Sequence, residues 1–260
     1  MAGAACRAFA HSITLKTPST WCIGAGVVRL SILIIDDFYD DPQAVRNAAL
    51  HTDYARQVDG ANYPGDNSAE AFEVQGLNEV VSNVVHEPLV GTPGSGHCRF
   101  RIATAGAETR ARARMHVDGQ SYWSGIVYLT LPEHCRGGTE FYRHKELGTD
   151  RAPIYDHEVA ALGKQSCAQF TQEIIRRDGK DPSKWEHLMT VPMQFNRCVL
   201  FRPWFWHTSG ESFGDCGENA RLIQLFFFTL DKSRLSSPPA GAGHAAPGSA
   251  RGANQDSSSS

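Results

Sequence analysis

Short strand-like segments follow one another from Cys98 to Leu230, and they limit the folds that this chain of 260 residues can adopt. Apolar and β-branched residues recur between turn signals, which predicts strands at 98–104, 110–118, 124–131, 193–201 and 219–230. Several strands at such short spacing favour a β-sandwich or β-barrel. Residues 144–190 interrupt the series with a helical pattern, and we interpret them as an insertion between strands.

The first third of the chain has a different pattern. An apolar run at 30–35 predicts a buried strand, and apolar spacing predicts helices that begin near Pro42 and within 72–88. Asp40 and Asp41, directly before Pro42, are expected to lie at or near the N-cap of the first helix. Residues 54–67 are expected to form a loop. Helices first and strands later predict an α+β fold, mainly β, in which the helices pack on one side of a mostly antiparallel sheet.

Both ends of the chain are expected to lie outside the folded domain, which then spans 31–235. Residues 1–30 contain no Asp or Glu, so they form either a disordered or a targeting extension. Residues 236–260 are rich in Pro, Gly, Ala and Ser and predict a disordered tail. A cytoplasmic protein is expected, and an organelle is the alternative if residues 1–30 are a transit peptide.

Composition argues against several classes of function. A net charge of −3 gives no reason to expect binding to nucleic acid, and no apolar stretch is long enough to predict a membrane span. The seven cysteines are scattered and form no C-x-x-C pair, so we expect reduced thiols of an intracellular protein.

A candidate metal site begins at His116 and Asp118. These residues are two apart, so on a strand both side chains point to the same face. A second imidazole from elsewhere, such as His207, would complete a two-histidine, one-carboxylate facial triad. That set of ligands binds Fe(II) and leaves coordination positions open.

The order of the motifs resembles that of the Fe(II)/2-oxoglutarate-dependent oxygenases, and within them the prolyl-hydroxylase-like branch. The motifs are H-x-D at 116–118, G-G-x-x-F at 137–141, W-x-W-H ending at His207, and Arg221 on the last predicted strand. The resemblance implies a double-stranded β-helix (jelly roll), with supporting helices from the N-terminal third and the insertion at about 144–190.

The resemblance also implies roles for single residues. His116, Asp118 and His207 match the ligands of Fe(II). Arg221 matches the residue that pairs with the distal carboxylate of the cosubstrate 2-oxoglutarate, which suits a planar guanidinium. Tyr128 matches a tyrosine that donates to the same carboxylate. Taken alone, an arginine such as Arg221 is more often a salt-bridge residue, and Tyr128 is equally a core hydroxyl.

The activity implied is a dioxygenase that uses molecular oxygen, releases succinate and CO2, and hydroxylates an amino acid, a peptide or a small metabolite. Asp118 supports hydroxylation, because halogenases of this superfamily have a small residue in place of the carboxylate. The loop 54–67 and the insertion 144–190 are the expected substrate contacts.

Two other classes remain open. A cupin-like metal enzyme would use the same fold without 2-oxoglutarate, although cupins usually show an H-x-H pattern. A non-catalytic jelly roll would bind a ligand or a partner only. Arg110, Arg112 and Arg114 are expected on a solvated face, and four further histidines are expected at the surface: His134, His144, His157 and His187.

Overall fold

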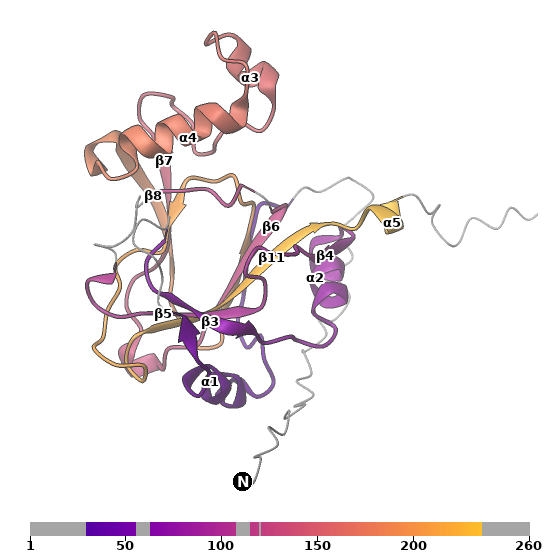
Figure 1. The fold of residues 1–260 in the computed structure, drawn as a ribbon, viewed down its shortest axis with the longest axis vertical. Coiled ribbons are helices and arrows are strands. Elements are labelled where there is room, and N and C mark those ends of the chain that lie inside the picture. The colour runs from indigo at the N-terminus through magenta and orange to yellow at the C-terminus, as the bar shows by residue number, and fades with distance from the viewer. Residues whose placement is uncertain (1–29, 56–62, 108–114, 120, 236–260) are drawn as a thin grey trace, which may run out of the picture.

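The structure is a computed structural model that describes residues 30–55, 63–107, 115–119 and 121–235. Over these ranges the chain forms one sheet of eight strands and one of three, with helices around them (Figure 1). The predicted α+β class, mainly β, is confirmed. The extensions predicted at 1–30 and 236–260 lie outside the described residues, apart from residue 30.

The strands of both sheets pair antiparallel. The large sheet has the order β1 (Ile32–Ile35), β9 (Cys198–Phe201), β6 (Trp123–Tyr128), β11 (Arg221–Leu230), β5 (Arg99–Ala103), β3 (Asp66–Ala71) and β2 (Tyr54–Ala55), and β4 (Leu89–Gly91) also pairs with β11. The small sheet has the order β10 (His207–Thr208), β7 (Gly138–His144) and β8 (Trp185–Pro192).

Strand β11 divides the interior into two layers. Its residues Leu222, Phe226 and Phe228 pack with the helices of the N-terminal third. Ile223 and Leu225 point the other way and pack with residues of the small sheet. This alternation follows from the period of two along a strand, and it leaves the odd-numbered residues of β11 to face the space between the sheets.

Two helices cover the outer layer, and both were predicted. Helix α1 (Pro42–Leu50) begins after Asp41, whose Oδ1 accepts a hydrogen bond from the Ala44 backbone N at 2.9 Å, so the predicted cap is confirmed. Helix α2 (Leu77–Val85) buries Val81 and Val85 in the same core. None of the helices in the described ranges has the length and apolar character needed to cross a membrane.

The predicted insertion at 144–190 is too long, because its last residues form β8. This strand pairs with β7 over its whole length. Only Trp185 and Val191 of β8 are buried, so the strand shows no apolar alternation that could have predicted it. The remaining elements are α3 (Asp156–Ala160), α4 (Cys167–Asp178), α5 (Lys232–Leu235) and the 3-10 turns η2 (Pro132–His134) and η3 (Pro182–Lys184).

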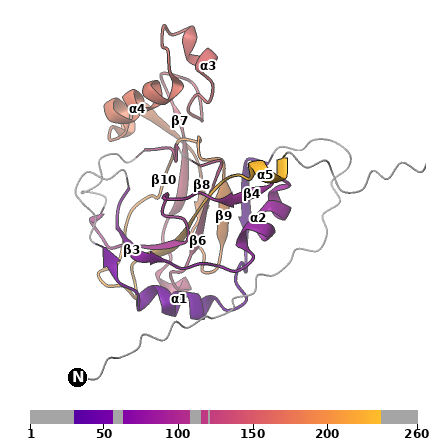
Figure 2. The same ribbon diagram turned by 45° about the vertical axis from the view of Figure 1, so that its right-hand side comes forward.

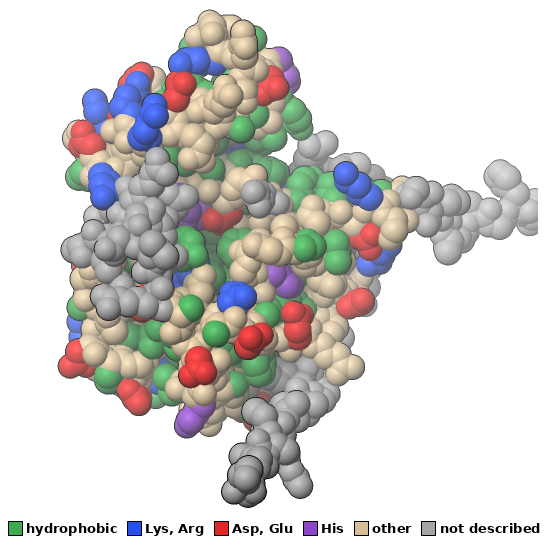
Figure 3. Space-filling view, in the orientation of Figure 1, with side chains coloured by type: hydrophobic (Ala, Val, Ile, Leu, Met, Phe, Trp, Pro, Cys, Tyr) green, Lys and Arg blue, Asp and Glu red, His purple; other side chains and the backbone are tan. Residues whose placement is uncertain are grey.

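Helices α3 and α4 extend from the small sheet, at the opposite end of the molecule from α1 (Figures 1 and 2). Basic and acidic side chains alternate on this part of the surface (Figure 3). Lys164 pairs with Glu173 and Arg177 with Glu146, each at 2.6 Å. Exposed ion pairs of this kind contribute little to stability. This surface of α3 and α4 is therefore a solvated face.

Three further segment boundaries differ from the prediction. Residues 115–118 are not a regular strand; His116 forms one isolated bridge with His207, and 108–114, with the three arginines predicted there, lie outside the described residues. The loop predicted at 54–67 contains β2 and the start of β3. The strand predicted at 193–201 begins only at Cys198.

Gly138 allows the small sheet to close at the G-G-x-x-F motif. A Cβ on Gly138 would lie 1.9 Å from the backbone oxygen of Val191 on β8. Side chains cannot occupy that space, so glycine is required where β7 begins. The close approach brings the next residue, Thr139, into the space between the sheets.

Candidate metal centre

The structure brings His116, Asp118 and His207 together. His116 and His207 exchange two backbone hydrogen bonds of 3.1 Å, and the Asp118 backbone N donates to the Pro203 oxygen at 2.9 Å. These bonds join two segments that are far apart in the sequence. The predicted juxtaposition is therefore present, although a bridge between the loop of His116 and strand β10 produces it and not a common face of one strand.

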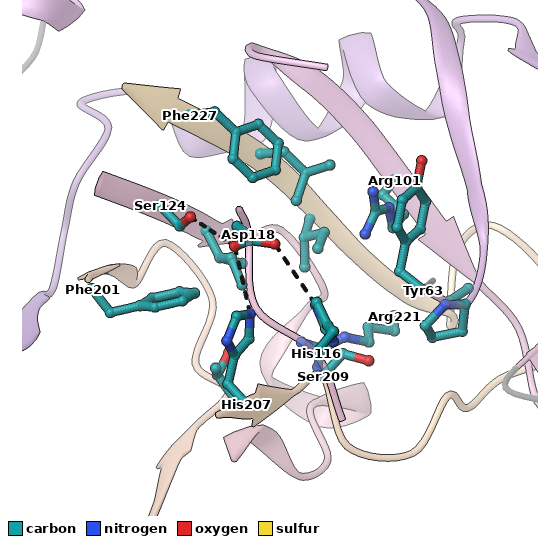
Figure 4. A pocket seen from close by; sticks show the side chains of 17 residues that line it. Tyr63, Arg101, His116, Asp118, Ser124, Phe201, His207, Ser209, Arg221 and Phe227 are labelled. Atoms are coloured by element: carbon teal, nitrogen blue, oxygen red, sulfur yellow. Dashed lines mark hydrogen bonds and ion pairs between the residues drawn. The ribbon is translucent and has the colours of Figure 1, made fainter. Parts of the chain in front are cut away.

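The ligand atoms of the three residues point to one another (Figure 4). His116 Nε2 lies 3.8 Å from Asp118 Oδ1, and His207 Nε2 lies 3.5 Å from Asp118 Oδ2. One ligand atom from each residue lies within 4.8 Å of the others. Two imidazoles and one carboxylate at this spacing form a donor set that fits Fe(II) and leaves positions open.

A backbone carbonyl sets the orientation of the His207 ring. Its Nδ1 lies 2.8 Å from the Phe205 oxygen. Because a carbonyl can only accept, Nδ1 donates this hydrogen bond, and Nε2 is left directed towards Asp118. Metal-bound histidines commonly use their second nitrogen in this way.

Asp118 stays ionised. Burial by itself would raise the pKa of its carboxyl group, but His207, His116 and the Ser124 hydroxyl together hold that pKa well below its ordinary value. Ser124 Oγ donates to Asp118 Oδ2 at 2.7 Å. A carboxylate held in this way is available as a ligand at neutral pH.

Ser124→Ala is expected to weaken Fe(II) binding by roughly tenfold or more, because groups that orient metal ligands typically contribute this much to affinity. Anaerobic calorimetric titration with Fe(II) measures the effect. Ser209→Ala is the matched control, since Ser209 lines the same pocket but its hydroxyl contacts the Gly210 oxygen. Equal affinities in the two variants would contradict the orienting role of Ser124.

A pocket opens beside the three ligands, between the two sheets. Apolar side chains of β6, β9 and β11 form much of its wall: Ile126, Phe201, Ile223, Leu225 and Phe227. The polar residues of the wall include the three candidate ligands, Ser124, Thr139, Ser209 and two arginines, Arg101 and Arg221. A mostly apolar pocket with a few convergent polar groups is typical of a small-molecule site.

Arg221 lies on the wall of this pocket, and the terminal nitrogens of its guanidinium lack hydrogen-bond partners among the described residues. Its side chain is buried, and the two nitrogens are Nη1 and Nη2. Burial lowers the pKa of Arg221, and Tyr128 beside it opposes that shift. A buried guanidinium without an acceptor is costly, so the pocket fits an anion at this place.

Tyr128 reaches the pocket only through a neighbour. Its hydroxyl lies 2.7 Å from Thr139 Oγ1, and Thr139 lines the pocket whereas Tyr128 does not. A direct contact between Tyr128 and a cosubstrate therefore stays a prediction.

Ser124, Thr139 and Arg101 were not predicted as site residues. Arg101 could have been found from the predicted strand 98–104, because a charged residue on a strand next to that of Arg221 is unusual in a core. Ser124 and Thr139 carry no comparable signal in a single sequence.

The prediction that His144 lies at the surface is wrong. His144 is fully buried on β7, and its Nε2 lies 2.8 Å from Oδ2 of Asp178 on α4. Trp185 Nε1 donates to the Asp178 backbone oxygen at 2.9 Å, in the same region. These bonds join the helical insertion to the small sheet, and they explain why a polar residue is buried there.

A family model matches residues 22–211 of this chain, and its description is "Family of unknown function (DUF6445)". The chain belongs to that family. The match includes the three candidate ligands and Tyr128 but ends before Arg221. A search among curated proteins finds no match for this DUF6445 chain.

Two solved structures are similar to this DUF6445 chain. One is the non-heme alpha ketoglutarate dependent epimerase SnoN from nogalamycin biosynthesis, with 15% identity, a TM-score of 0.45, and coverage of 77% of this chain and 79% of that chain. The other is the non-heme alpha ketoglutarate dependent carbocyclase SnoK from the same biosynthesis, with 10% identity, a TM-score of 0.46, and coverage of 77% and 80%. The function of the DUF6445 chain is therefore inferred from its own site.

Proposed function

We propose that this protein is an Fe(II)- and 2-oxoglutarate-dependent dioxygenase that hydroxylates an amino acid, a peptide or a small metabolite and releases succinate and CO2. His116, Asp118 and His207 are the proposed ligands of Fe(II). Their donor atoms are of the right kind, and a pocket opens on one side of them. The proposal includes the prolyl-hydroxylase-like branch that the order of the motifs resembles.

The observation that carries the proposal is the buried fork of Arg221. A metal triad alone suits many enzymes, including a cupin-like one. A guanidinium with two unpartnered nitrogens in the same pocket suits the distal carboxylate of 2-oxoglutarate. Thr139 and Tyr128 form the polar edge beside Arg221, and we propose that a hydroxyl of this pair donates to the same carboxylate.

The arrangement of strands supports a jelly-roll core. Two antiparallel sheets pack with the apolar side chains of β11 and β9 against those of β7 and β8. Such a double layer holds residues from distant segments in a fixed geometry. We propose that the catalytic domain spans 31–235.

The residues of this chain have distinct tasks in the proposed reaction. Nε2 of His116, Nε2 of His207 and the Asp118 carboxylate would hold Fe(II) at the wall of the pocket. The apolar wall excludes water from the reacting groups. When bound, iron and 2-oxoglutarate supply the oxidising chemistry, which the protein orients and shields.

Anaerobic titration with Fe(II) and then 2-oxoglutarate tests the proposal. A visible charge-transfer band is expected when both are present, and succinate is expected to form once oxygen is admitted. Glutarate is the control, because it can pair with Arg221 but lacks the 2-oxo group that chelates the metal. A folded protein that binds Fe(II) but shows neither band nor succinate would contradict the proposal and favour the cupin-like alternative.

A further inference from the structure

A second arginine, Arg101, lies on the wall of the same pocket as Arg221 (Figure 4). Arg101 pairs with Ile223, and Ala103 pairs with Arg221, across the neighbouring strands β5 and β11. All four residues line the pocket, so the two arginines are diagonal neighbours on one face of the sheet. The proposed binding of 2-oxoglutarate requires only one of them.

Arg101 is held in a fixed orientation. Its Nε donates to Asn67 Oδ1 at 2.7 Å, and its guanidinium carbon lies 3.3 Å from the centre of the Tyr63 ring. Asn67 Nδ2 also donates to the Tyr63 hydroxyl at 3.0 Å, which joins the three side chains. A guanidinium that is stacked and hydrogen-bonded in this way loses little freedom when it binds an anion.

A glycine brings the Tyr63 segment this close to β5. Gly65 has a φ of +91°, and a Cβ there would lie 2.4 Å from the Ile102 backbone oxygen. Only glycine combines that backbone conformation with so close an approach. Tyr63 and Pro64, which precede Gly65, therefore lie against β5 and line the pocket.

Within the described part of the chain, the charge of Arg101 has no carboxylate partner in the pocket. Asp118 is the only acidic residue among the described residues of the wall, and no carboxylate of the described ranges forms an ion pair with Arg101. In the proposed complex, Asp118 and the two carboxylates of 2-oxoglutarate balance the charges of Fe(II) and Arg221. Among the described residues of this partly buried site, Arg101 then remains as one uncompensated positive charge.

We propose that Arg101 binds a carboxylate of the substrate, and that the substrate is a small carboxylic acid with an apolar body. This inference rests on the proposed function, since it assigns Arg221 to the cosubstrate. The single charge and the planar edge of the guanidinium match a carboxylate with its two oxygens. The apolar wall of β6, β9 and β11 matches the body of such a molecule.

Paired acids and amides test the carboxylate site without turnover. Oxygen-free protein with Fe(II) and 2-oxoglutarate is titrated in a calorimeter with 3-phenylpropanoate and 3-phenylpropanamide, and then with N-acetyl-leucine and its amide. The first pair represents a free carboxylic acid and the second a C-terminal carboxylate. In wild type, at least one acid is expected to bind roughly tenfold or more tightly than its amide, as a charge-assisted bidentate pair should.

Two variants and a control assign that preference to Arg101. Arg101→Gln is expected to bring the ratio of affinities for acid and amide close to one and to leave 2-oxoglutarate binding little changed. Asn67→Ala keeps the charge but releases Nε, so a partial loss is expected. Arg143→Gln is the control, because Arg143 is a half-exposed surface residue paired with Glu186, and it should keep the full ratio.

The outcomes separate this inference from the proposed function. The charge-transfer band reports whether Fe(II) and 2-oxoglutarate bind, and the acid and amide titrations are repeated on metal-free protein. An acid preference that Arg101→Gln removes supports the carboxylate site even if the band is absent. A ratio near one in wild type, no binding of either acid, a ratio that survives Arg101→Gln, or tighter binding of inorganic phosphate would each overturn it.

Discussion

His207→Ala is expected to weaken Fe(II) binding by more than about 100-fold, which is the largest effect we expect on the metal site. Loss of a ligand should exceed the effect of losing a group that only orients one. Asp118 and His116 would remain, but a histidine and a carboxylate rarely retain a divalent ion against water. Anaerobic calorimetry with Fe(II) measures the change.

Packing must be separated from ligation in this experiment, because His207 is buried and its ring centre lies 4.8 Å from that of Phe201. His207→Phe keeps an aromatic ring and removes the ligand, so it should lose the metal while keeping a cooperative thermal transition. His187→Ala removes an exposed histidine of β8 and should bind Fe(II) as wild type does. Retention of tight Fe(II) binding in both His207 variants would refute its role as a ligand.

Long runs of apolar residues made much of the fold predictable. The strand expected at 219–230 is present as β11, because five of its residues face each side of a buried sheet and seven of the ten are apolar. Strand β3 has the sequence DNSAEA and lies near the edge of the sheet. Ser68 is its only buried residue, and none of its side chains is large and apolar, so the strand gives no periodic apolar signal. The predicted loop 54–67 covered its first two residues.

The candidate site was predictable for a different reason. The spacing of His116 and Asp118 suggested a metal site, and the order of the motifs, which resembles that of the oxygenases, added His207 and Arg221. The geometry that joins them was not predictable, since the bridge between His116 and His207 depends on contacts between distant segments. For the same reason the burial of His144 was missed: its partner, Asp178, is on α4.

Arg221→Met is expected to remove 2-oxoglutarate binding and to stabilise the ligand-free protein. The guanidinium is buried with both terminal nitrogens unpartnered among the described residues, so it carries the cost of desolvation without a compensating bond. Methionine has a similar length and no charge. We expect the free energy of unfolding to rise by about 1–3 kcal/mol, as when buried charges are replaced by apolar residues.

Cosubstrate affinity should change in the opposite direction. Loss of one partner of a buried, hydrogen-bonded charge pair is expected to lower the affinity for 2-oxoglutarate on the order of 100-fold. Urea denaturation with and without Fe(II) and 2-oxoglutarate measures both effects. Wild type should gain stability from the ligands, and Arg221→Met should start higher and gain little.

Arg143→Met is the matched control for this pair of effects. Arg143 forms a half-exposed ion pair with Glu186 at 3.2 Å, so its loss should change the free energy of unfolding by less than about 1 kcal/mol and leave 2-oxoglutarate binding intact. If Arg221→Met instead destabilised the ligand-free protein by several kcal/mol, Arg221 would be a structural residue. A gain in stability together with a loss of binding is the result that only a site built for an anionic ligand explains, because its charge is unfavourable until the ligand arrives.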